Sequence, residues 1–71
     1  MKNWIPQDIK DLRMKYMLSQ PAFGEIVGVS GNYIYLLEKG VKRPSKTLRL
    51  LLGYIENEIE KGKGNYGKRD L

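Results

Sequence analysis

The chain has 71 residues, and its 13 Lys and Arg against 8 Asp and Glu give a formal net charge of +5. This length suits one small domain with a thin hydrophobic core, and it leaves no room for a second domain. The chain has no Cys and no His, so it lacks the commonest metal ligands and the usual general base. We therefore expect no metal, no cofactor and no enzymatic activity, while the positive charge favours a polyanionic partner.

Membrane insertion and export are not expected from the sequence. No apolar run approaches the ~20 residues that a bilayer span needs, and residues 1–6 lack the apolar stretch of a signal peptide. We expect a cytoplasmic protein with no membrane partner.

Helix signals dominate the chain and no segment alternates like a half-buried strand, so the sequence predicts an all-α fold of four to five short helices. The first helix is predicted from Pro6 to Tyr16. Pro6 suits the first turn, where its missing N–H has no intrahelical partner, and Asp8 suits that turn electrostatically. Ile9, Leu12 and Tyr16 recur at the i, i+3 and i+7 spacing of one helical face.

The second helix is predicted to follow Ser19, its N-cap, with Pro21 in its first turn and Leu18 as a buried linker residue. Its predicted inward-facing residues are Phe23, Ile26 and Val27. Gly24 is the small residue expected where the third helix approaches closely. Gly28 is placed to end the second helix with a positive φ.

Ser30 is predicted to cap a third helix from Gly31 to Glu38, with Ile34 and Leu37 turned into the core and Lys39-Gly40 at its end. Residues 41–44 form a loop, and Ser45 caps the last helix. The predicted core positions of that helix are Leu48, Leu51, Leu52, Ile55 and Ile59. The predicted organisation is an N-terminal arm (1–5), a helical domain (6–61) and a flexible glycine-rich tail (62–71).

Charge is unevenly distributed along the chain. Residues 39–49 contain no acid and five cations, which are Lys39, Lys42, Arg43, Lys46 and Arg49. Acidic residues crowd the end of the last helix instead, so one end of the molecule should be positive. Such a run is either a polyanion-binding surface or an ordinary solvated face.

Two short helices joined by a tight glycine-containing turn meet the geometric requirement of a helix-turn-helix. The segments 18–20, 23–30, 37–40 and 43–45, together with Ile34, resemble the pattern of the Cro and repressor-type helix-turn-helix regulators of bacteria and phages, from about Ile9 to Ile55. This resemblance implies a lambda-repressor-like domain that binds double-stranded DNA, and therefore a nucleoid-associated transcriptional regulator. We expect a repressor that occupies its operator, since no effector domain is present.

The resemblance also implies roles for individual residues. The base-reading positions on the third helix are Gly31, Asn32, Tyr33 and Leu36, of which Asn32 is suited to bidentate recognition of an adenine edge. The implied DNA-backbone contacts are Gln20, Tyr35, Lys39, Lys42, Arg43 and Lys46. Gln20 matches a position that either touches the backbone or braces the reading residues. Both tyrosines remain open to interpretation as ordinary exposed aromatics.

Departures from the family pattern affect the expected reading surface. Relatives often carry long polar residues at the positions of Gly31 and Leu36. We therefore expect few direct base contacts, with apolar packing or DNA shape supplying part of the specificity.

Leu50 and Tyr54 form a second apolar stripe on the last helix, which is either a homodimer contact or incidental exposure. The alternative function is an antitoxin-type interaction module, in which the last helix and the tail bind a toxin or another protein while the third helix autoregulates through DNA.

Overall fold

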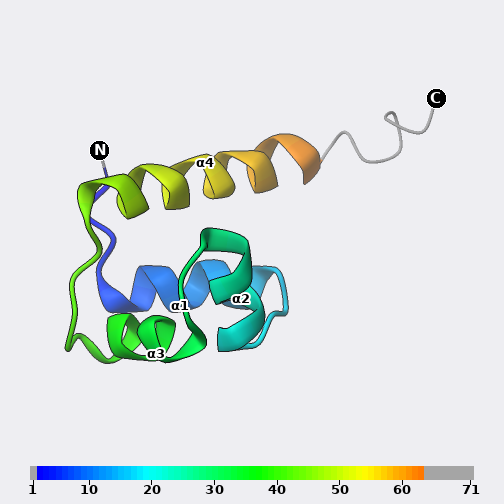
Figure 1. Ribbon diagram of the computed structural model, residues 1–71. Helices are drawn as coiled ribbons and strands as arrows, with labels where there is room; N and C mark the ends of the chain where they lie inside the picture. The colour runs from blue at the N-terminus through cyan, green and yellow to red at the C-terminus, as the bar shows by residue number, and fades with distance from the viewer. Residues whose placement is uncertain (1, 64–71) are drawn as a thin grey trace.

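The computed structural model describes the backbone of residues 2–63 and the side chains of residues 2–58. Within this range the regular elements are the helices α1 (Pro6–Lys15), α2 (Gln20–Val27), α3 (Gly31–Lys39) and α4 (Lys46–Lys63), which confirms the predicted all-α class (Figure 1). With its 18 residues, α4 is longer than predicted, and residues 62 and 63 are helical. Residues 64–71, the rest of the predicted tail, lie outside the described residues.

Serine side chains cap three of these helices, as the sequence predicts. Oγ of Ser19 accepts a hydrogen bond from the Ala22 N–H at 3.2 Å, and the corresponding distances are 3.0 Å for Ser30 with Tyr33 and 3.1 Å for Ser45 with Leu48. Each bond satisfies an N–H that has no partner within the first turn of its helix. The described helices include none that is both long enough and apolar enough to cross a bilayer.

The core is assembled from all four helices and from one residue that precedes them. Its buried members are Trp4, Ile9, Leu12, Phe23, Val27, Ile34, Leu37, Leu48 and Leu52. Leu18, Leu51 and Ile55 pack against this core and are partly buried. Apart from Trp4, these positions confirm the predicted core, while the side chain of Ile59 lies outside the described residues.

Trp4 belongs to the segment predicted as an arm, yet its side chain is 2% exposed. Lys2 contacts the indole ring, since its Nζ lies 4.4 Å from the ring centroid. The same Nζ lies 2.8 Å from Oε2 of Glu56 on α4. This hydrogen bond to Glu56 raises the pKa of Lys2. The N-terminal segment is thereby attached to α4.

Two predicted inward-facing residues are exposed. Ile26 is 57% exposed because the buried side of α2 is formed by Phe23, Gly24 and Val27. A rotation of about 100° per residue places Ile26 on the other side of Phe23 from Gly24. Tyr16 is 36% exposed because α1 ends at Lys15, so Tyr16 is the C-cap rather than part of the buried face.

The helices form two unequal parts (Figure 1). In Figure 1, α1, α2 and α3 cluster together and α4 runs along the opposite side of this cluster from α3. The most extensive helix–helix contact joins α2 to α3, followed by that of α1 with α3. This arrangement leaves the side of α3 that faces away from α4 uncovered by any other described helix.

Candidate functional site

The turn between α2 and α3 depends on two glycines. Gly28 ends α2 with φ +83°, a left-handed conformation that favours glycine. Val29 N–H then donates to the Gly24 carbonyl at 2.9 Å. A Cβ on Gly24 would lie 2.5 Å from the Val29 carbonyl oxygen, so only glycine fits there. The predicted close approach at Gly24 is confirmed, and it comes from the backbone that leads into α3.

Gly31 has a packing role at the start of α3. A Cβ at this position would lie 2.8 Å from Cα and 2.9 Å from N of Pro21, in the first turn of α2. The first turns of α2 and α3 therefore touch through their backbones, and this contact explains why a long polar side chain is missing at Gly31. Whether its backbone approaches a base remains a prediction from the resemblance.

The exposed face of α3 carries a stripe of four residues. Asn32, Tyr35, Leu36 and Lys39 recur at i, i+3, i+4 and i+7, which places them on one side of the helix. Asn32 and Lys39 are exposed, Tyr35 is 44% exposed, and Leu36 is half-buried. Nζ of Lys39 lies 5.7 Å from the centroid of the Tyr35 ring, within the range of a cation–π contact. We call these four residues the α3 stripe.

Tyr33 lies apart from this stripe. It is half-buried and packs against the hydrophobic core, so part of its ring is used for packing. Among the four predicted base-reading residues, Asn32 is therefore the one whose side chain is exposed on α3.

The loop after α3 folds back onto the end of that helix. Gly40 ends α3 with φ +81°, and the N–H groups of Val41 and Lys42 donate to the Leu36 carbonyl at 3.0 and 3.3 Å. Lys42, Arg43 and Lys46 are all exposed. We call these three cations, together with Lys39 at the end of the α3 stripe, the basic loop; the three follow α3 in the chain.

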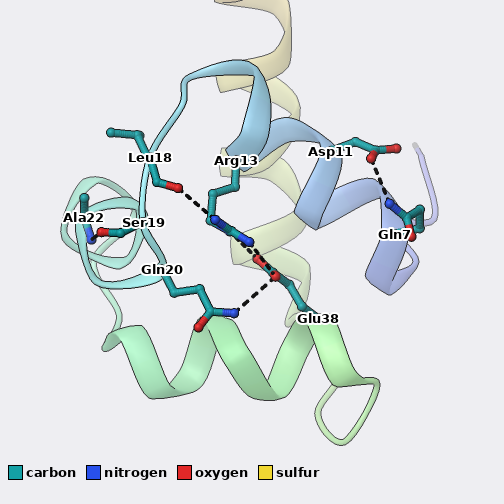
Figure 2. A network of polar contacts seen from close by, with 8 residues as sticks. All are labelled: Gln7, Asp11, Arg13, Leu18, Ser19, Gln20, Ala22 and Glu38. Atoms are coloured by element: carbon teal, nitrogen blue, oxygen red, sulfur yellow. Dashed lines mark hydrogen bonds and ion pairs between the residues drawn. The ribbon is translucent and has the colours of Figure 1, made fainter.

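A polar network holds α3 in place (Figure 2). Arg13 on α1 donates from Nε to Oε2 of Glu38 at 2.7 Å and from Nη2 to Oε1 at 3.1 Å, and its Nη1 donates to the Leu18 carbonyl at 2.8 Å. The two side chains are only 12% and 7% exposed. The hydrogen bond to Glu38 raises the pKa of Arg13, which stays charged.

Gln20 joins the same network through its Nε2, which donates to Oε1 of Glu38 at 3.2 Å (Figure 2). Gln20 thus contacts Glu38, which is not one of the predicted base-reading residues, and its contact with the DNA backbone stays a prediction. Sequence analysis assigned no role to Arg13 or Glu38. One signal was available, because Glu38 is the single acid between residues 26 and 55, in the middle of a basic stretch.

Leu50 and Tyr54 are 44% and 68% exposed on α4. Their helix, α4, runs along the opposite side of the α1–α3 cluster from α3 (Figure 1).

The chemistry of the site is that of hydrogen-bond donation and positive charge. Within residues 2–58 no group of carboxylates is arranged to hold a metal ion. The site instead presents an amide, a phenol and several ammonium and guanidinium groups, which are the groups that contact base edges and phosphates. Comparisons with protein-family models, with curated proteins and with solved structures find no match.

Proposed function

We propose that this protein binds double-stranded DNA sequence-specifically and acts as a transcriptional regulator, a repressor that occupies its operator on the nucleoid. The observation that carries this proposal is the exposed α3 stripe, continued by the basic loop, on a helix whose other side is fixed to α1 by Arg13 and Glu38. An α-helix with its side chains is about 10–12 Å across, and the major groove is about 12 Å wide. The uncovered side of α3 therefore has the size and shape to enter the groove.

Within this proposal, Asn32 reads bases and the basic loop sets affinity. A carboxamide both donates and accepts, which matches the N6 and N7 groups of adenine. Lys39, Lys42, Arg43 and Lys46 neutralise phosphates, and that contribution falls as salt rises. Gly31 and Leu36 offer no side-chain hydrogen bond, so DNA shape supplies part of the specificity.

Each copy of the chain has one reading helix, so we propose that a homodimer binds a palindromic site. Two copies would place two α3 helices on half-sites about one helical turn (~34 Å) apart. Leu50 and Tyr54, both exposed on α4, are the proposed contact.

The same exposed apolar residues favour a second candidate, an antitoxin-type module that binds a toxin or another protein through α4. Co-purification of a stoichiometric partner from the native cell, abolished by Tyr54→Ala, would favour this candidate over the homodimer. A homogeneous dimer that binds paired half-sites would exclude it.

The experiment is selection of bound sequences from a randomised duplex pool at two salt concentrations, with Asn32→Ala and Asn57→Ala in parallel. Asn57 is an exposed asparagine on α4, so its substitution is the matched control. We expect one enriched motif, which Asn32→Ala relaxes at particular bases and Asn57→Ala leaves unchanged. Binding that depends on salt but not on sequence would refute the regulator.

A further inference from the structure

Leu36 is an apolar residue in the exposed α3 stripe, four residues after Asn32 and three before Lys39. It is half-buried, but it does not belong to the partly buried apolar residues that pack against the core. Those residues are Leu18, Val29, Tyr33, Leu51 and Ile55. Core packing therefore does not explain why this position of α3 is apolar.

The two tyrosines next to Leu36 on α3 already have contacts within the chain. Tyr33 packs against the core, and the Lys39 ammonium lies 5.7 Å from the centroid of the Tyr35 ring. Leu36 has neither of these contacts. The exposed part of its side chain is therefore left for a ligand.

The loop after α3 holds the backbone of Leu36 in place. The Leu36 carbonyl accepts hydrogen bonds from the N–H groups of Val41 and Lys42 at 3.0 and 3.3 Å. The side chain of Leu36 thus extends from a backbone that is fixed relative to the basic loop, so phosphates bound by that loop would set its position in a groove. Residues 39–49 contain five cations and no acid, which favours DNA over a protein surface as the partner.

The chemistry of the major groove offers one match for an apolar side chain. Among the four bases, thymine presents an apolar group there, its C5 methyl, while adenine presents the N6 and N7 groups that fit a carboxamide. Four residues of an α-helix rise by about 6 Å, and stacked base pairs lie about 3.4 Å apart. On a helix that lies along the groove, Leu36 therefore reaches a base pair within two steps of the one that meets Asn32.

We propose that Leu36 reads the C5 methyl group of a thymine within two base-pair steps of the adenine bound by Asn32. This inference rests on the proposed DNA binding and names the base group that the apolar part of the α3 stripe recognises. Burial of one methyl carbon contributes about 0.8 kcal/mol, which is about fourfold in Kd. Uracil lacks this methyl group and keeps the hydrogen-bonding groups of thymine, so uracil at this position should weaken binding about fourfold.

The experiment starts from the site obtained by selection and replaces each of its thymines with uracil, one at a time. Fluorescence anisotropy with the full chain at constant salt gives Kd for each duplex. We expect one thymine in a half-site whose replacement weakens binding about fourfold. This thymine should lie within two steps of a base pair at which Asn32→Ala relaxes the specificity.

Variants of the protein assign the effect to Leu36. Leu36→Ala should bind the thymine and uracil duplexes equally, because the side chain that meets the methyl group is removed. Leu36→Met keeps an apolar side chain of similar size and should keep a preference for thymine. Met14→Ala shortens an apolar side chain that is 56% exposed on α1, and this matched control should keep the fourfold preference.

A second measurement on the unaltered chain covers the case in which Leu36→Ala fails to fold. We expect an intermolecular nuclear Overhauser effect between the methyl groups of Leu36 and the thymine. Its absence from the complex would overturn the inference.

Two outcomes of the uracil series would overturn the inference while leaving DNA binding intact. The first is a sequence-specific site in which no uracil lowers the affinity. The second is a fourfold preference that persists in Leu36→Ala, which would assign the effect to another side chain or to DNA shape. A pool with no enriched sequence would instead overturn the proposed regulator and this inference together.

Discussion

Arg13 and Glu38 lie 25 positions apart in the sequence and meet through two hydrogen bonds, Nε to Oε2 at 2.7 Å and Nη2 to Oε1 at 3.1 Å (Figure 2). This bidentate pair fixes the last turn of α3 to α1 on the inner side of the helix. Because Gln20 and the Leu18 carbonyl complete the network, it also reaches the beginning of α2. The orientation of the α3 stripe therefore depends on the contact between Arg13 and Glu38, although neither residue belongs to the stripe.

Glu38→Gln should lower the free energy of unfolding by about 2–3 kcal/mol, because it leaves the guanidinium of Arg13 largely buried without its counter-charge. Urea unfolding followed by circular dichroism measures this change. Glu25→Gln makes the same chemical change at an exposed site on α2 and should stay within about 0.5 kcal/mol of the parent. Equal effects of the two substitutions would show that the buried pair does not stabilise the fold.

Gly24→Ala should destabilise the protein by about 2 kcal/mol or more, because its Cβ would lie 2.5 Å from the Val29 carbonyl oxygen, and that oxygen belongs to the backbone. Gly53→Ala is the control, since a Cβ there meets nothing within 4 Å and alanine favours a helix interior by about 1 kcal/mol. Thermal unfolding should move in opposite directions for the two variants. A stable Gly24→Ala variant would show that the α2–α3 turn can open.

Trp4→Ala should destabilise the protein by about 3–5 kcal/mol, enough to unfold a domain of this size in large part, because the indole ring is buried in the core. Ile5→Ala removes a neighbouring apolar side chain that is 52% exposed, and it should have a much smaller effect. Denaturant unfolding of the two variants compares them directly. If Trp4→Ala were as stable as Ile5→Ala, the segment before α1 would not be part of the folded domain.

Arg43→Gln should weaken duplex binding at every sequence and reduce the slope of log K against log salt by about one unit, because one phosphate contact is lost. Lys10→Gln, on α1, has the same effect on net charge and should leave the slope unchanged. Fluorescence anisotropy at several salt concentrations gives both slopes. If the parent and both variants had the same slope, the basic loop would not be part of the DNA-binding surface.

Local features of the fold were predictable because they depend on residues close together in the chain. Ser19, Ser30 and Ser45 each bond an N–H three residues ahead, and Gly28 and Gly40 each end a helix with a positive φ. The position of Asn32 on the exposed side of α3 follows from the same helical spacing that buries Ile34 and Leu37. Helix type, helix order and the exposed face of α3 could therefore be derived from spacing alone.

Contacts between distant residues could not be derived in this way. Tertiary packing buries Trp4 from a segment that reads as an arm, and it exposes Ile26 although this residue is as apolar as its buried neighbours. The reason in both cases is that burial depends on where another element passes, and neither spacing nor composition contains that information.

The sequence by itself determined four helices, their serine caps, their glycine ends and the basic run that follows α3, because each is set by the steric and hydrogen-bonding preferences of neighbouring residues. The tertiary structure alone decided that Glu38, the one acid near that run, turns inward to Arg13. It also decided that Trp4, from the segment before α1, comes to lie beside Arg49 of α4. These outcomes require three-dimensional packing, because it brings together charges and donors that the chain holds far apart.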